Sequence, residues 1–349
     1  MRDSTDSVLR LDAREAAERA GTTDGTLSVP ALARALRERG APAVVITGER
    51  DDWLDTPHAS GWLSRPASGP PDHAMRFRDA LQRGWVAADA AVLARLPDGA
   101  TAADLPVLSV GETPLRWVPP RGDPPDLGVY AIVDSADRVR RCAEAGAGLV
   151  QLRIKVDRDH PAVEPEVMKA LQATRAHGAT LVVNDHWRTA LALGAPAIHL
   201  GQEDWCSLTD GERTTLAAAQ AAGLQLGLSS HSLWELCRAR GAAPAMVACG
   251  PVWPTLTKAM PWHPQGLDNL AWWVRMAGVP VIAIGGILEP EQLAQAAATG
   301  AATACVVRGL GNDPRDTLPV WQAAWRGGRQ RTRMAAPAWP HPTLPVGHG

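Results

Sequence analysis

The segment Gly250–Lys258, with the sequence GPVWPTLTK, carries several side chains that could bind phosphate. It follows an apolar run at 245–249 that is typical of a buried strand. Glycine and two prolines end this run and stiffen the turn. Thr255, Thr257 and Lys258 then follow, and lysine is a mobile point charge suited to phosphate oxygens. Such a segment could be an ordinary polar loop, but it is not the only one of its kind here.

Polar residues also follow the other apolar runs in the C-terminal two thirds of the chain. In the segment QLRIK, Gln151, Arg153 and Lys155 recur at every second position, so an extended strand would place them on one face. A Gly-Gly turn lets an anion approach backbone N–H groups at the start of a helix. The further positions of this kind are Asn184, Asp185, His199, Asp204, Ser229, His231, Gly285, Gly286, Val307 and Arg308.

Two of these residues, Asp185 and Asp204, are expected on neighbouring strands. Paired carboxylates with few nearby histidines or cysteines suit Mg²⁺, which prefers oxygen ligands. Mg²⁺ in turn suits a diphosphate, whose remaining charge would meet lysine, serine and threonine side chains. Each aspartate could instead be the N-cap of the next helix, and Glu203 could take the place of Asp204. We interpret His199 as structural, because its neighbours carry the charge.

Eight short apolar runs, each followed by a helix-compatible segment, could position these residues. They cover residues 128–133, 148–153, 179–183, 197–200, 224–228, 245–249, 279–284 and 303–307. Eight β/α units in about 200 residues predict a compact (β/α)8 TIM barrel of the α/β class. A doubly wound open sheet would share the same alternation. In a barrel, the carboxyl ends of all eight strands meet at one mouth, where active sites lie.

The first third of the chain has a different pattern, which predicts a small α/β appendage to the barrel. Residues 1–27 are polar and weakly patterned, and residues 97–126 are rich in proline and glycine. The predicted elements are a helix at 29–40, a strand at 43–47, a polar loop at 48–52, and helices at 72–83 and 87–96.

These patterns divide the chain into four parts. We expect the appendage at 1–115, a linker at 116–126, the barrel at 127–328 and a disordered tail at 329–349. Composition does not indicate the oligomeric state.

Composition excludes several classes of protein. The net charge of -2 gives no reason to expect nucleic acid or an anionic membrane as a partner. No apolar run approaches the roughly 20 residues needed to span a bilayer, and the polar N-terminus lacks a signal-peptide core. Five scattered cysteines without a CxxC pair argue against a zinc site or a disulfide framework. We therefore expect a cytoplasmic protein that acts on small molecules.

Taken together, the motifs between residues 128 and 309 resemble those of the thiamine-phosphate synthase family. The resemblance rests on QLRxK at 151–155, VND at 183–185, HLGQED at 199–204, GxSxH at 227–231, GPxxPTxTK at 250–258 and IGGI at 284–287. It implies a transferase that joins 4-amino-2-methyl-5-hydroxymethylpyrimidine diphosphate to 4-methyl-5-(2-phosphoethyl)thiazole, giving thiamine phosphate and pyrophosphate. In the family, the bond to diphosphate breaks first and the thiazole nitrogen captures the pyrimidine carbocation.

The resemblance also implies a role for each matching residue, with Lys155, Ser229 and Lys258 as the catalytic set. Asp185 and Asp204 would bind Mg²⁺. The diphosphate would be held by Arg153, Lys155, Asn184, Ser229 and Lys258, and the aminopyrimidine by Gln151. The thiazole phosphate would be held by Thr255, Thr257, Gly285, Gly286 and Val307. Arg308 departs from the family, which more often has a small serine there, so it could add a phosphate contact or crowd the site.

The N-terminal segment resembles the C-terminal part of the hydroxymethylpyrimidine phosphate kinases, which have a ribokinase-like fold. The resemblance lies in residues 35–48 and 84–94. Where such kinases carry a glycine-rich anion hole, this chain has SGPPDH at 68–73, which offers few N–H donors and a repelling aspartate. The segment could also be an unrelated α/β cap. In either case we expect no kinase activity.

Two other functions fit the same barrel. One is a regulator that binds ligands of the thiamine pathway without coupling them, which the degenerate N-terminal segment makes plausible. The other is a thiazole tautomerase, a related barrel expected to lack part of the diphosphate apparatus. The aspartates and lysines retained here argue against both.

Overall fold

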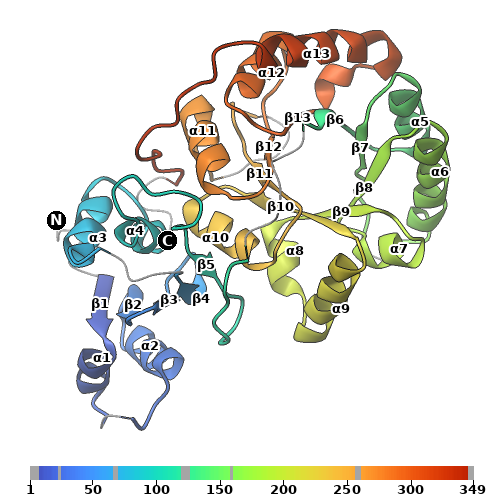
Figure 1. Cartoon of the computed structure of the whole chain (residues 1–349). Coiled ribbons are helices and arrows are strands. Elements are labelled where there is room, and N and C mark those ends of the chain that lie inside the picture. Colours follow the sequence, from blue (N-terminus) through green and yellow to red (C-terminus); the bar gives the residue numbers. More distant parts are fainter. Residues whose placement is uncertain are drawn as a thin grey trace.

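A computed structural model describes residues 8–22, 25–65, 70–118, 126–157, 160–255 and 261–344 of the 349-residue chain. It contains two units, a five-stranded sheet with helices and a closed eight-stranded barrel (Figure 1). In the described part of the chain, no helix is long and apolar enough to cross a membrane.

The barrel confirms the predicted fold class. Its strands run in the order β10-β11-β12-β13-β6-β7-β8-β9, and β10 pairs in parallel with β9 to close the ring. Each of the eight predicted runs overlaps one strand. The strands are β6 (Gly128–Val133), β7 (Leu149–Leu152), β8 (Thr180–Asn184), β9 (Ala197–Leu200), β10 (Gln225–Ser230), β11 (Met246–Cys249), β12 (Val281–Ala283) and β13 (Thr303–Val306).

Helices cover the outside of the barrel, so each strand is buried on both faces, as expected for a parallel sheet. They are α5 (Ala136–Glu144), α6 (Val163–Ala176), α7 (Trp187–Ala192), α8 (Gln202–Ser207), α9 (Asp210–Ala221), α10 (Leu233–Gly241), α11 (Gly266–Met276), α12 (Pro290–Ala298), the 3₁₀ helix η2 (Arg308–Leu310) and α13 (Pro314–Arg329). Inside the barrel, a separate core that includes Tyr130, Leu149, Val182 and Met246 fills the ring.

The period of two along each strand decides which side chains reach the mouth. Leu149 belongs to the interior core, so Gln151 and Arg153 also face inward. Val182 and Ala197 likewise place Asn184 and His199 inside. The interior core thus sets the phase that turns the polar residues at the strand ends into the barrel.

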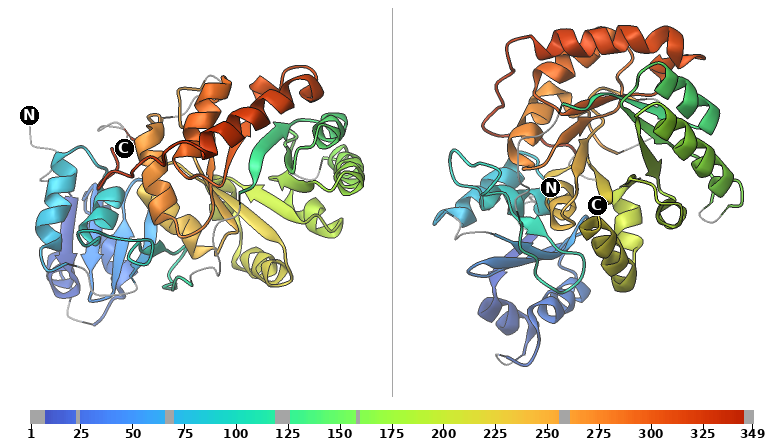
Figure 2. Two further views of the ribbon diagram at one scale, coloured as in Figure 1. Left: turned by 45° about the horizontal axis from the view of Figure 1, so that its top comes forward. Right: turned by 45° about the vertical axis from the view of Figure 1, so that its right-hand side comes forward.

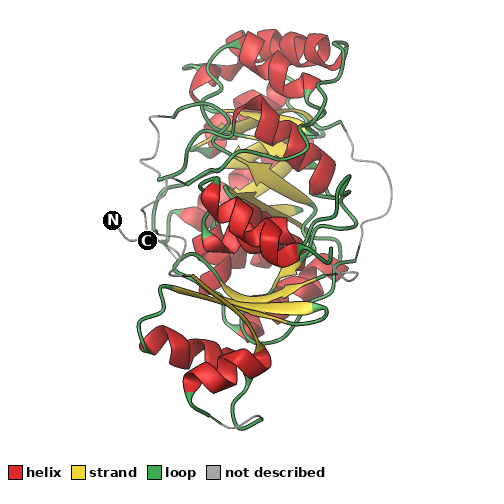
Figure 3. Cartoon of the chain, turned by 90° about the vertical axis from the view of Figure 1, so that its left-hand side faces the viewer, coloured by secondary structure: helices red, strands yellow, loops and turns green. Residues whose placement is uncertain are grey.

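The N-terminal unit is a mixed sheet in the order β1-β2-β3-β4-β5, in which only β1 and β2 are parallel. Figure 3 shows helices on both sides of this sheet. Its elements are β1 (Val8–Asp12), α1 (Ala13–Ala20), α2 (Val29–Glu38), β2 (Ala43–Thr47), β3 (Asp51–Asp55), β4 (Ser60–Ser64), α3 (His73–Gln82), α4 (Ala87–Ala94) and β5 (Val107–Leu108).

Three sequence predictions for this unit were incomplete. The weakly patterned start contains β1 and α1, whose first turn is closed by a reciprocal capping box between Asp12 and Glu15. The polar loop at 48–52 already includes the start of β3, and the proline-rich stretch contributes β5. Tertiary pairing supplies these strands, because their short or charged sequences carry little local signal. The resemblance of the unit to a kinase fragment stays a prediction, and its motif residues Ser68 and Gly69 lie outside the described residues.

The N-terminal unit packs against α10 of the barrel, as both views in Figure 2 illustrate. Almost every residue of α10 is buried, and its apolar side chains share one continuous core with α4 and β5. At its C-terminal end, Arg240 is 1% exposed and donates to the carbonyls of Leu105 and Ala102 at 2.9 and 2.8 Å. Its guanidinium also lies 4.0 Å from the ring centre of Trp117.

The prediction of a disordered tail was wrong for residues 330–344. The backbone of His341 exchanges two hydrogen bonds with the side chain of Asn269 on α11, at 2.8 and 3.0 Å. The N–H of His263 donates to the carbonyl of Thr343 at 2.7 Å, and Leu344 is buried. Its proline-rich composition suggested disorder, but the tail is ordered by these partners on the barrel.

Candidate active site

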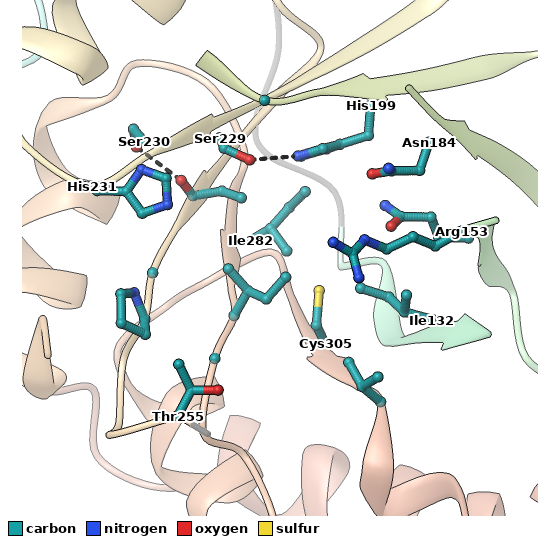
Figure 4. Close-up of a pocket in the computed structure, with 18 of the residues that line it drawn as sticks. Ile132, Arg153, Asn184, His199, Ser229, Ser230, His231, Thr255, Ile282 and Cys305 are labelled. Atoms are coloured by element: carbon teal, nitrogen blue, oxygen red, sulfur yellow. Dashed lines mark hydrogen bonds between the residues drawn. The ribbon is translucent and has the colours of Figure 1, made fainter. Parts of the chain in front are cut away.

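A cavity of about 540 Å³ opens at the carboxyl ends of the barrel strands. All eight strands or the loops that directly follow them contribute to its wall, and its size is in the range of small-molecule sites. Figure 4 shows its side chains, with Arg153, Asn184 and His199 arriving from one side. Ile132, Ile282 and Cys305 form an apolar part of the wall.

Most of the predicted site residues line this one cavity. They are Gln151, Arg153, Asn184, Asp185, Asp204, Ser229, Thr255, Gly285, Gly286 and Val307, together with Arg308. Lys155 is exposed and is not part of the cavity wall. Thr257 and Lys258 lie outside the described residues.

At the floor of the cavity, the side chains of Gln151 and Tyr130 are hydrogen-bonded at 2.8 Å. Both are buried, and burial raises the pKa of Tyr130 well above its usual value. The phenol therefore stays neutral and fixes the Gln151 amide within the cavity. Tyr130 itself lacked a sequence signal, because it stands inside an apolar strand.

His199 reaches across to β10, where its Nε2 lies 3.0 Å from Oγ of Ser229 (Figure 4). Burial lowers the pKa of His199 to about 4, with smaller contributions from the charges of Arg153 and His231. The ring is therefore neutral at neutral pH. Among the described residues, its buried Nδ1 has no hydrogen-bond partner.

Asp185 and Asp204 bring two carboxylates to the same wall of the cavity. Asp185 is half-buried, and its pKa is raised first by burial and then by the charge of Asp204, against the opposing charge of Arg153. Neither residue is an N-cap, because α7 is preceded by His186 and α8 by Gly201. Glu203 also lines the cavity, so it still competes with Asp204 for the same role.

The predicted Gly-Gly turn packs directly against the turn after β11. A Cβ atom at Gly285 would lie 2.6 Å from Cα of Pro251, and one at Gly286 would lie 2.6 Å from Cβ of Trp253. Both glycines have positive φ angles, 93° and 72°. The N–H of Trp253 donates to the carbonyl of Gly285 at 3.1 Å. The close contact fixes Thr255 and the glycine turn on one side of the cavity.

Sequence reasoning singled out His231 but missed Glu235 and Trp262, which contact it at the mouth of the cavity. Glu235 on α10 is 4% exposed, and its Oε2 accepts from the backbone N–H and from Nδ1 of His231, at 2.7 and 2.8 Å. The Trp262 ring stacks on His231 with centroids 5.3 Å apart and an angle of 13°. His231 precedes the N-cap Ser232 of α10, and Glu235 lies in the first turn of that helix, so no helical spacing marked the pair in the sequence. Trp262 had no signal either.

Comparisons with known proteins place these observations in a family. Residues 129–310 match the profile described as thiamine monophosphate synthase. The thiamine-phosphate synthase of Rhizobium etli is 46% identical over 203 residues, which are 56% of this chain and 96% of that protein. That of Neisseria meningitidis serogroup A is 42% identical over 204 residues, covering 58% and 96%. The solved thiamine phosphate pyrophosphorylase of Pyrococcus furiosus is 27% identical, covers 58% of this chain and 97% of its own, and has a TM-score of 0.49.

Proposed function

The chain belongs to the thiamine monophosphate synthase family, and we propose that its cavity joins the pyrimidine and thiazole halves of thiamine phosphate. The substrates are 4-amino-2-methyl-5-hydroxymethylpyrimidine diphosphate and 4-methyl-5-(2-phosphoethyl)thiazole, and pyrophosphate is released. The observation that carries this proposal is the convergence of Gln151, Arg153, Asn184, Ser229 and two aspartates on a single cavity.

The residues present fit a Mg²⁺ ion. Asp185 and Asp204 are the expected oxygen donors, and both line the cavity. The pKa of Asp185 is raised first by burial and then by the charge of Asp204, and a bound cation would oppose the second of these effects. When bound, the ion would supply positive charge beside the diphosphate. The two aspartates would hold it at the edge of the cavity, next to Arg153.

The cationic and polar side chains would bind and orient the leaving diphosphate. As the bond to the pyrimidine methylene carbon breaks, negative charge grows on the diphosphate oxygen. Arg153, Asn184 and Ser229 are placed in advance, so they stabilise this charge without reorganising. We assign Lys155 and Lys258 to the same group from the family resemblance, with Lys155 approaching from the exposed rim.

The neutral histidine and the apolar wall suit the other half of the reaction. A protonated imidazole beside Ser229 would oppose the pyrimidine carbocation, whereas the lowered pKa of His199 keeps that ring uncharged. Ile132 and Ile282 would exclude water that could capture the cation. Gln151, fixed by Tyr130, would orient the aminopyrimidine ring.

The glycine turn and Thr255 would hold the phosphate of the thiazole, together with Thr257. Figure 4 shows Thr255 across the cavity from Arg153 and Asn184, so the thiazole would lie on that side. Val307 and Arg308 also line the cavity, and the exposed Arg308 would add a phosphate contact there.

The proposal is tested with the full chain and both substrates, with and without Mg²⁺. Thiamine phosphate and pyrophosphate should form in equal amounts, and removal of metal by a chelator should stop the reaction until Mg²⁺ is restored. Binding of both substrates without any product would favour a regulator instead. Conversion of a thiazole carboxylate substrate alone would favour the tautomerase reaction.

A further inference from the structure

The first turn of α10 joins the N-terminal unit to the cavity. Asp89 on α4 is 1% exposed and accepts a hydrogen bond from the backbone N–H of Trp234 at 3.0 Å. The N–H of Leu233 is also directed to this carboxylate. The first N–H groups of a helix have no partner within the helix. Here the side chain of Asp89, from the N-terminal unit, is the hydrogen-bond acceptor for such an N–H group.

The first turn of α10 is also connected to residues of the cavity wall. The N–H of Glu235 donates to the N-cap Ser232 at 3.3 Å, and the Glu235 carboxylate binds both the backbone and the ring of His231. His231 follows β10, which carries Ser229. A shift of the first turn of α10 would therefore move His231 and the end of β10 together.

The same turn also supports Trp262. Its ring lies 6.2 Å from the ring of Trp234, at an angle of 46°, and it also stacks on His231. Trp262 and His231 both line the cavity. Gln265, which is fully buried, donates to the carbonyl of His231 at 2.8 Å and ties the segment after Trp262 to the same place.

From these contacts we propose that the N-terminal unit is a positioning part of the active site, acting through the hydrogen bonds that Asp89 accepts from α10. Asp89 holds the first turn of α10, Trp234 and Glu235 on that turn hold Trp262 and His231, and these two form one wall of the cavity. Asp89 is thus a positioning residue that touches no substrate. The proposal rests on the coupling reaction proposed above.

The test compares two changes at opposite ends of the same helix in the full chain. Asp89→Ala removes the acceptor, Asp89→Asn keeps an acceptor oxygen, and Arg240→Met removes interface hydrogen bonds far from the cavity. Steady-state coupling is measured well below the melting temperature of each variant. We expect kcat/KM to fall about tenfold in Asp89→Ala, because small misplacements in a site are costly. It should recover in Asp89→Asn and stay within about twofold of the original in Arg240→Met.

A double-mutant cycle then tests the route through the aromatic rings. If Asp89 acts through Trp262, adding Asp89→Ala to Trp262→Leu should cost much less than Asp89→Ala alone, because residues in one network are not additive. Additive losses, or equal losses in Asp89→Ala and Arg240→Met, would overturn the proposal. Absence of coupling by the unaltered chain would instead overturn the proposed function.

Discussion

Gly227 lies so close to the ring of His199 that a Cβ atom at position 227 would be 2.6 Å from Nδ1 of the histidine. The two residues are paired neighbours on β10 and β9. The absence of a side chain at position 227 therefore leaves room for the neutral imidazole, whose Nε2 reaches Ser229.

This relationship predicts that Gly227→Ala displaces His199. We expect kcat/KM to fall about tenfold or more, together with a loss of stability of about 1–3 kcal/mol from overpacking. Coupling kinetics and thermal unfolding would measure the two effects. Gly211→Ala is the control, because a Cβ atom there meets nothing within 4 Å and the exposed site lies in α9. Equal activity in both variants would contradict the prediction.

The variant Asp204→Asn should show whether Asp204 or its neighbour Glu203 binds the metal. If Asp204 binds Mg²⁺, the variant should lose roughly 100-fold or more in turnover, because the cation that stabilises the developing negative charge of the diphosphate would be held less well. It should also need more Mg²⁺, which calorimetric titration can measure without substrate. Glu203→Gln is the matched control and should behave like the unaltered chain. The reverse result would assign the metal to Glu203.

The buried carboxyl of Asp89 predicts a pH dependence of stability. Burial raises its pKa to about 7, with a further contribution from the charge of Glu235, against hydrogen bonds from α10. In the unfolded chain the pKa is near 3.8, so between about pH 4 and 7 the folded state binds the proton more tightly. The contribution of Asp89 to stability is therefore largest at about pH 4 and decreases as the pH rises to 7.

Urea unfolding at several pH values would measure this slope. Asp89→Asn cannot titrate, so it should remove the Asp89 part of the decrease while other groups keep theirs. A decrease of the same size in both proteins would show that Asp89 does not titrate in this range.

Removing the N-terminal unit should destabilise the barrel. A chain that starts at residue 126 would expose α10, including Leu233, Trp234 and Leu236, which are at most 6% exposed in the full protein. Large exposed apolar patches favour aggregation. We expect this fragment to aggregate, and co-expression with residues 1–118 to restore a complex, as size-exclusion chromatography would show. A stable, fully active fragment would mean that the N-terminal unit is dispensable.

Within the N-terminal unit, Arg95 and Asp52 form a buried ion pair, with Nε donating to Oδ2 at 2.6 Å. Arg95→Met would remove the guanidinium that binds the buried Asp52 carboxylate, which would keep the N–H of Gly48 as a donor. We expect a loss of about 3–5 kcal/mol in unfolding free energy. The double variant Arg95→Met with Asp52→Asn should lose less, since the carboxylate that Arg95 balanced is neutralised as well. Chemical denaturation of both variants decides the question, and equal losses would show that the pair does not stabilise through its charges.

The sequence by itself determined the barrel and most of the cavity. Period-two alternation ties Gln151 and Arg153 to the interior residue Leu149, so strand pattern alone was enough to place them together. The pairing of Asp185 with Asp204 likewise follows from the order of neighbouring strands. These predictions succeeded because they depend on local periodicity and on one closed, regular topology.

Only the tertiary structure decided which residues far apart in the chain touch each other. Trp262 meets His231, Asp89 caps α10, and His341 binds Asn269 through contacts between residues far apart in the chain. No local pattern marks such residues, because their role depends on a partner that folding alone brings near. The same reason explains why β1, β5 and the ordered tail were not predicted. The barrel strands were predicted because turn signals flank them in the sequence.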